Sequence, residues 1–252
     1  PETVKPGTLA KDYYNVKDDY MFEVDLTPNR IDAASHFGVA RDLAAWMKAQ
    51  GMQTDLHSPS VDAFHSDRAD GAIPVEVECQ EATIRYAGLT IRGVKVAESP
   101  EWLRNYLTAI GQRPINNVVD ITNFILNAYC QPLHCFDLAK VKCNKIVVRP
   151  AAEGSKFVTL DGVERTMTAR DLMICNAEEP MCIAGVFGGL DSGVTEQTTD
   201  IFLESACFHP TWVRKTARRQ GLNTDASCDL CPQGCRIARE GAGRRRNLRR
   251  NL

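Results

Sequence analysis

The sequence lacks both a strong charge of one sign and a long hydrophobic run. Its 252 residues carry a formal net charge of -2 at pH 7, so no global positive field marks a nucleic-acid-binding protein, although a local basic patch would suffice for RNA. No secretory signal and no apolar stretch of membrane length is present, which argues against export or a transmembrane helix. We therefore expect a cytoplasmic protein without a membrane partner, of one large or two small domains.

Cysteine, by contrast, is frequent, with ten residues. Most lie inside apolar runs, as at residues 172–175 and 181–184, where a cysteine is typically a small buried hydrophobic residue. Reduced thiols in a cytoplasm fit this pattern better than a disulfide scaffold. Cys228, Cys231 and Cys235 have a spacing that invites a zinc interpretation, but no fourth ligand follows at a suitable distance. We therefore expect no metal site.

Residues 1–50 are expected to form a small strand-helix segment. The opening stretch is polar and irregular and begins without Met, which we interpret as the start of an excised piece of a longer chain. Residues 21–26 alternate apolar and polar side chains, as a half-buried strand does. Apolar residues at helical spacing predict a helix over residues 35–50. Residues 51–72 are polar, show no sustained period and are interpreted as a linker.

The main domain is expected over residues 73–227. The Ser-Pro pair at 99–100 predicts a helix that starts with a serine cap and ends at Gly111. Further helices are expected over 119–129 and 210–220. Strand-like runs separated by Gly and Asp lie at residues 73–77, 84–89, 94–96, 145–149, 156–159, 172–175, 183–187 and 200–204. These elements predict an α+β fold with a sheet-rich centre and flanking helices.

Two neighbouring stretches hold polar residues at fixed points of an apolar framework. They read RPINNVVDITN at residues 113–123 and QPLHCFD at residues 131–137. Thr122 and Asn123 would lie beside one another on the expected helix, and His134 follows a Gln-Pro turn that holds its imidazole near a bend. These stretches resemble the signature of the B3/B4 domain in the family of bacterial-type phenylalanyl-tRNA synthetase β subunits.

Other segments resemble the same family, and they follow its order along the chain. DLTPNR at 25–30 and GVARDL at 38–43 resemble the segment that precedes the B3/B4 domain. IAGVFGG at 183–189 resembles the Gly-rich turn of that domain. ESA at 204–206 and GLNTDAS at 221–227 resemble its later signatures. Any one piece is a weak signal, but together they indicate a fragment of such a β subunit.

The resemblance implies an editing function. In this family the B3/B4 domain hydrolyses tRNA(Phe) mischarged with tyrosine, within an enzyme that ligates Phe to tRNA(Phe) using ATP and Mg²⁺. It also implies an α subunit as partner, in an assembly of two α and two β subunits, and no cofactor in this fragment. No ATP-binding or aminoacylation motif is visible, so the fragment should not charge tRNA alone. The candidate catalytic residues are His134, Thr122 and Glu204, and the candidate substrate-binding residues are Asn123, Gly188, Thr224 and Ala226.

The difference between the two amino acids suggests roles for these residues. A site that hydrogen-bonds the tyrosine hydroxyl can reject an analogue without it by roughly 10⁴–10⁵. An ionised Glu204 would accept a strong hydrogen bond from the phenol, and Gly188 and Ala226 would leave room for its ring. His134 and Thr122 would hold the attacking water or the terminal ribose. Whether His134 acts as a base, or the ribose hydroxyl of the tRNA takes part, is left open by the residues.

The basic residues near the C-terminus allow several interpretations. Arg214 and Arg218 lie on the last expected helix and are candidate contacts for tRNA phosphates, although such a run also suits a solvated face. Residues 228–252 form a Cys- and Arg-rich tail where the family has an aromatic-Arg-aromatic-Glu-Arg-Gly run. We interpret this tail as disordered or non-native, for example after a frame error. A basic RNA-binding tail is the alternative.

Two other functions stay compatible with the sequence. The first is a non-catalytic module that binds tRNA or the α subunit, against which the joint presence of Thr122, His134, Glu204 and Ala226 argues. The second is a zinc or redox protein built on the cysteines. That alternative predicts stoichiometric metal or a labile disulfide, which a metal assay on the purified protein would detect.

Overall fold

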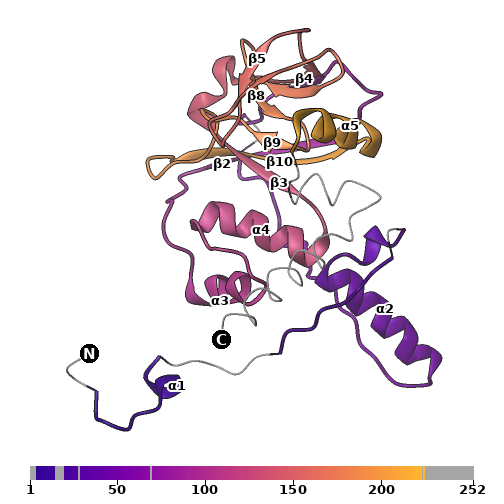
Figure 1. The fold of residues 1–252 in the computed structure, drawn as a ribbon, viewed down its shortest axis with the longest axis vertical. Coiled ribbons are helices and arrows are strands. Elements are labelled where there is room, and N and C mark those ends of the chain that lie inside the picture. Colours follow the sequence, from indigo (N-terminus) through magenta and orange to yellow (C-terminus); the bar gives the residue numbers. More distant parts are fainter. Residues whose placement is uncertain (1–3, 15–19, 28, 69, 223, 225–252) are drawn as a thin grey trace.

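The structure is a computed structural model in which a central sheet is covered by a second sheet and by helices (Figure 1). The described residues are 4–14, 20–27, 29–68, 70–222 and 224. The helices are α1 (Ala10–Tyr13), α2 (His36–Ala49), α3 (Glu101–Ala109), α4 (Asn117–Tyr129) and α5 (Pro210–Gln220), with short 3₁₀ turns at Ile31–Ala33, Leu138–Lys140 and Lys142–Asn144. The strands are β1 (Val75–Val77), β2 (Thr83–Arg92), β3 (Leu133–Asp137), β4 (Ile146–Pro150), β5 (Lys156–Val158), β6 (Glu164–Thr166), β7 (Leu172–Cys175), β8 (Pro180–Ile183), β9 (Phe187–Gly188) and β10 (Asp200–Phe208).

The strands form three sheets, which confirm the predicted α+β class. The central antiparallel sheet has the order β2-β10-β3, and a five-stranded sheet has the order β1-β4-β7-β8-β9. Strands β5 and β6 form a separate hairpin. In the five-stranded sheet only the β1–β4 pair is parallel. The helices α3 and α4 lie on the opposite side of the central sheet from the five-stranded sheet (Figure 1).

Strand β10 separates two hydrophobic cores because its side chains alternate between the faces of the central sheet. Phe202 and Phe208 point into the main core, which the five-stranded sheet also lines. Ile201 lies on the other face, in a smaller core with Val118 of α4 and Cys135 of β3. The central sheet is therefore buried on both faces, so polar side chains on it are held in a poorly solvated setting.

The predicted helices agree with the structure to within about two residues, but the sequence does not predict the short helix α1 and places one cap wrongly. Helices α2 and α5 match the predictions, and Ser35 caps α2 by accepting a hydrogen bond from the Gly38 amide at 3.0 Å. The predicted serine cap of α3 is wrong, because Pro100 occupies the N-cap position. Ser99 instead donates to Asp120 Oδ2 at 2.5 Å. The Ser99 hydroxyl, which the sequence pattern predicts as a helix cap, is therefore bound to the fully buried carboxyl of Asp120 on α4.

Three strand predictions are wrong. Residues 21–26 belong to none of the three sheets, and alternation alone does not form a strand without a partner for its backbone groups. Residues 94–96 are also not a strand, although the Val94 amide donates to the Thr199 carbonyl oxygen. The run 183–187 is mainly the turn between β8 and β9, where Gly185 has a φ of 67°.

Strands β3, β6 and β8 are not predicted by the sequence, since β8 shares only Ile183 with the run expected at 183–187. Strand β3 looked like a turn after a Gln-Pro pair, yet it pairs with β10 over five residues, from Leu133 to Asp137. Strand β6 completes the small hairpin with β5. None of the described helices has the length and apolar character needed to cross a membrane.

Candidate functional site

A small pocket opens between the two sheets and the C-terminal half of α4. Its volume is about 270 Å³. Thr122 and Asn123 come from α4, His134 from β3, Gly188 from β9 and Glu204 from β10, and Thr224 follows α5. The structure therefore brings together six of the seven residues predicted to act on the substrate. The seventh, Ala226, lies outside the described residues.

The sheet register places two titratable residues of the pocket, Glu204 and His134, side by side. Glu204 on β10 is the Cα partner of His134 on β3. Glu204 is only 6% exposed, and one of its oxygens, Oε2, accepts a hydrogen bond from the Tyr86 hydroxyl at 3.2 Å. Residues directly opposite on neighbouring strands project from the same face. The carboxyl and the imidazole therefore enter the pocket from one surface of the central sheet.

Burial makes this carboxyl unusually hard to ionise. Desolvation raises the pKa of Glu204 to about 8, and the hydrogen bond from Tyr86 opposes this shift without cancelling it. At neutral pH the carboxyl is therefore mainly protonated, in contrast to the ionised group expected from the sequence. A carboxylic acid offers an O–H donor as well as an acceptor oxygen.

His134 is also neutral at physiological pH, because desolvation lowers its pKa to about 4. Its Nε2 atom is buried and makes no hydrogen bond within the described part of the chain. The ring packs edge-on against Phe136, with centroids 4.5 Å apart. A buried nitrogen without a partner is costly, so this atom is a natural contact for a ligand or a water molecule.

Two threonine hydroxyls of the pocket are fixed by hydrogen bonds to backbone carbonyl groups. The Thr122 hydroxyl donates to the Val119 carbonyl oxygen at 2.7 Å. The Thr224 hydroxyl donates to the Val186 carbonyl oxygen, also at 2.7 Å, which ties the segment after α5 to the turn between β8 and β9. The Thr122 hydroxyl oxygen retains acceptor capacity toward the pocket.

Gly188 touches the histidine more closely than the sequence suggested. A Cβ atom at this position would lie 3.2 Å from His134 Cε1. The absent side chain therefore makes room for the imidazole. Whether it also makes room for a substrate ring, as predicted, stays a prediction.

The predicted RNA-binding residues lie outside the pocket wall. Arg214 is half-buried and Arg218 exposed, both on α5 and four residues apart. Their neighbour Arg219 is structural, since its Nη2 atom donates to the Arg170 carbonyl oxygen at 2.9 Å and its guanidinium pairs with buried Asp171. Contact of Arg214 and Arg218 with tRNA stays a prediction.

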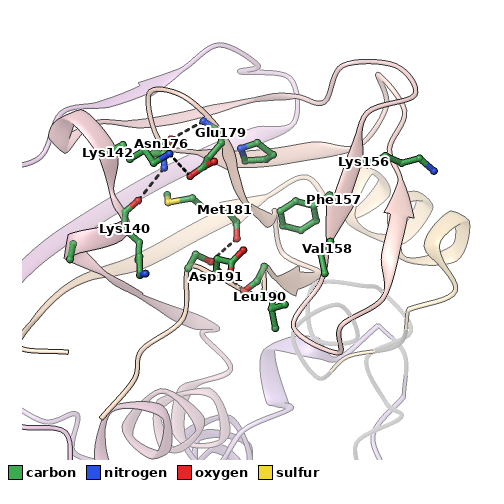
Figure 2. Close-up of a pocket in the computed structure, with 14 residues that line it drawn as sticks. Lys140, Lys142, Lys156, Phe157, Val158, Asn176, Glu179, Met181, Leu190 and Asp191 are labelled. Carbon is green, nitrogen blue, oxygen red and sulfur yellow. Dashed lines mark hydrogen bonds and ion pairs between the residues drawn. The ribbon is translucent and has the colours of Figure 1, made fainter. Parts of the chain in front are cut away.

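A second, larger hollow lies at the open end of the β8–β9 hairpin, against Met181 and Gly189, with a volume of about 530 Å³. Lysines surround it, and Figure 2 shows Lys142 and Glu179 on one side with Lys156 on the other. Lys142 pairs with Glu179 at 2.9 Å, and both side chains are largely solvated. None of the predicted catalytic residues lines it.

Metal ligands do not cluster in the part of the chain that the structure describes. Cys135, Cys175 and Cys182 are buried, as the sequence predicted, whereas Cys143 and Cys207 are exposed. The cysteines of the zinc alternative, at 228, 231 and 235, lie outside the described residues.

Tyr86 lies outside the pocket wall but contacts Glu204, and the sequence did not single it out. Its contact with Glu204 joins residues 118 positions apart. No local pattern around Tyr86 signals such a contact, because it depends on the pairing of β2 with β10.

The fold is of the α+β class, and its two larger sheets border a pocket that holds a buried carboxylic acid and a neutral histidine. The family model described as "B3/4 domain" matches residues 82–230, and the chain belongs to this family. The match overlaps the main domain predicted at residues 73–227, and the family predicted from the sequence motifs is confirmed.

The chain is similar to β subunits of phenylalanine–tRNA ligase. It is 67% identical over 227 residues to the subunit of Bacteroides fragilis and 60% identical over 228 residues to that of Porphyromonas gingivalis, covering 90% of this chain in each case. It spans only 28% of the length of either relative. Among solved structures, an N-terminal fragment of the phenylalanyl-tRNA synthetase β subunit from Pyrococcus horikoshii aligns with a TM-score of 0.41 at 18% identity, over 77% of this chain and 59% of that one.

Proposed function

We propose that this chain is the editing domain of a phenylalanine–tRNA ligase β subunit and hydrolyses the ester of tyrosine misattached to tRNA(Phe). The observation that carries the proposal is the convergence of His134, Glu204, Thr122 and Thr224 on one pocket. The names of the similar subunits support the synthetase context. The pocket supplies a buried acid that can distinguish a phenol from a plain phenyl ring.

Discrimination depends on the protonated state of Glu204. A neutral carboxyl can donate to the phenol oxygen or accept from its hydroxyl, so tyrosine binds without adding a buried charge. Phenylalanine offers the carboxyl no partner, and an unpaired buried polar group is costly. An apolar synthetic site discriminates poorly against the extra hydroxyl of tyrosine. The editing pocket, by contrast, requires that hydroxyl for binding.

Hydrolysis needs modest help because an aminoacyl ester is already reactive. Neutral His134 Nε2 can accept a hydrogen bond from water and orient it toward the ester carbonyl. A conjugate acid with a pKa near 4 makes this nitrogen a weak base. We therefore assign His134 to positioning the water, with Thr122 and Asn123 holding the terminal ribose and Thr224 the amino acid.

The wider enzyme is part of the same proposal. The chain would act with tRNA(Phe) and an α subunit, in a cytoplasmic assembly of two α and two β subunits that uses ATP and Mg²⁺ for ligation. Arg214 and Arg218 would contact phosphates of the tRNA.

The test compares release of amino acid from Tyr-tRNA(Phe) and Phe-tRNA(Phe) with the chain in excess over tRNA. We expect faster loss of tyrosine, and a loss of that preference in Glu204→Ala. Glu179→Ala is the matched control, because it removes a carboxyl from the larger hollow, and it should behave as the unchanged chain. Binding of tRNA without hydrolysis of either ester would refute the proposal and favour the non-catalytic module.

A further inference from the structure

Tyr86 approaches Glu204 from the neighbouring strand. It lies on β2 opposite Ala206 of β10, two residues along from the pair formed by Gly88 and Glu204. Side chains two residues apart on a strand share a face, so Tyr86 lies diagonal to the carboxyl on the face that lines the pocket. Diagonal neighbours on a sheet are within reach of an aromatic side chain.

The residue directly opposite Glu204 on β2 is Gly88, which has no side chain to contact the carboxyl, so Tyr86 makes that contact. A Cβ at Gly88 would lie 2.1 Å from Cζ of Phe202, so the Phe202 ring occupies that space. Tyr86 also packs edge-on against Phe208, with ring centroids 6.4 Å apart. The phenol is thus oriented by packing before it meets the acid.

The contact with Tyr86 makes the two oxygens of the Glu204 carboxyl differ in their hydrogen bonding. Tyr86 donates to Oε2 at 3.2 Å, and Oε1 makes no hydrogen bond to another described residue. Glu204 lines the pocket, whereas Tyr86 is not part of its wall. One oxygen is therefore held from behind, and the other is left for a ligand.

We propose that Tyr86 is a positioning and specificity-determining residue, whose phenol holds Oε2 of Glu204 so that Oε1 meets the hydroxyl of the bound tyrosyl ester. This inference rests on the proposed function. It assigns the discrimination to a Tyr86–Glu204 pair rather than to Glu204 alone. Burial raises the pKa of Glu204 to about 8, so the acid is mainly neutral at pH 7. Oε2 accepts the hydrogen bond from Tyr86, and we therefore place the proton on Oε1.

The first test is Tyr86→Phe, which keeps the ring and its packing on Phe208 and removes only the hydroxyl. We expect Tyr-tRNA(Phe) hydrolysis to fall roughly fivefold to tenfold, while Phe-tRNA(Phe) hydrolysis stays within about twofold. Tyr106→Phe is the matched control, because its hydroxyl bonds His36 Nδ1 at 2.8 Å, away from the pocket. If Tyr86→Phe leaves the ratio of the Tyr-tRNA(Phe) and Phe-tRNA(Phe) hydrolysis rates unchanged, the inference is overturned and the proposed function still stands.

A second measurement is independent of activity. Carbon-13 NMR titration of the Glu204 carboxyl, identified by its loss in Glu204→Gln, reports the pKa directly. Loss of the Tyr86 hydroxyl removes a donor that favours the ionised form, so the titration should move to higher pH in Tyr86→Phe and stay in place in Tyr106→Phe. An unmoved titration would overturn the contact itself. If the unchanged chain hydrolyses neither ester, the proposed function fails, and the inference fails with it.

Discussion

The two hollows at opposite ends of the β8–β9 hairpin differ in the state of their ionisable groups. The larger one, of about 530 Å³, is lined by lysines and acids that stay solvated and pair with one another. The smaller one, of about 270 Å³, holds Glu204 and His134, whose pKa values burial moves to about 8 and about 4. Size alone would favour the larger hollow, but strongly perturbed groups mark functional sites. Desolvation, rather than volume, distinguishes the candidate site.

The largest expected effect is the pH dependence that Glu204 imposes on folding. Its pKa is about 8 in the folded chain against an ordinary value of 4.5, so the folded state retains a proton that the unfolded state releases. Stability is then fully present below about pH 4.5 and is lost as the pH rises toward 8. Glu204→Gln should remove roughly 3 kcal/mol of this decline between about pH 5 and pH 8.

Urea unfolding at several pH values checks this effect. His134 acts in the opposite direction, because its lowered pKa favours the folded state at high pH and costs stability as the pH falls from 6.5 toward 4. The difference between Glu204→Gln and the unchanged chain isolates the carboxyl. Glu179→Gln, in the larger hollow, should leave the slope as it is. Equal slopes in all three proteins would contradict the proposed contrast between the hollows.

The next effect concerns catalysis. His134→Ala should slow Tyr-tRNA(Phe) hydrolysis about a hundredfold, because misplacing the attacking water by about 1 Å has a cost of that order. Lys156→Ala in the larger hollow removes an exposed lysine that contacts Thr166 and Glu164, and it should change the rate less than about twofold. Single-turnover rates of both variants decide the matter. Comparable losses in the two would mean that the larger hollow also takes part in the reaction.

Gly188→Ala should give a smaller loss. The added Cβ would lie 3.2 Å from His134 Cε1, so the imidazole must shift by a few tenths of an ångström. We expect roughly a tenfold loss of Tyr-tRNA(Phe) hydrolysis, with little change in the unfolding midpoint. Gly193→Ala is the matched control, since a Cβ there meets nothing within 4 Å. Full activity of Gly188→Ala would show that the histidine tolerates displacement.

Local sequence signals predicted the helices well because caps and glycines act over a few residues. Ser35 before α2 and Gly221 after α5 are examples. Sheet structure depends on partners that are distant in sequence, so the alternation at 21–26 predicts a strand that does not form, and no local signal predicts β3. Ser99 shows the same limit at a helix end, where a tertiary hydrogen bond replaced a cap.

The candidate site divides in the same way. The order of the motifs predicts a set of site residues, and the six of them that the structure describes line one pocket. Residue identity could not give the protonation of Glu204, because desolvation depends on how the two sheets close over it. Nor could it give Tyr86, whose role arises from the register of β2 against β10.

The smallest expected effect lies in the larger hollow. Lys142 bonds Glu178 and Glu179 at 3.1 and 2.9 Å, and all three side chains are between 44% and 58% exposed. Exposed ion pairs contribute little, because solvent screens them and ordering long side chains costs entropy. Lys142→Met should therefore leave the unfolding midpoint within experimental error, at low salt and at about 1 M salt alike. A clear salt-dependent loss would mean that these charges are better shielded from water than their exposure indicates. The larger hollow would then share the feature that now distinguishes the smaller one.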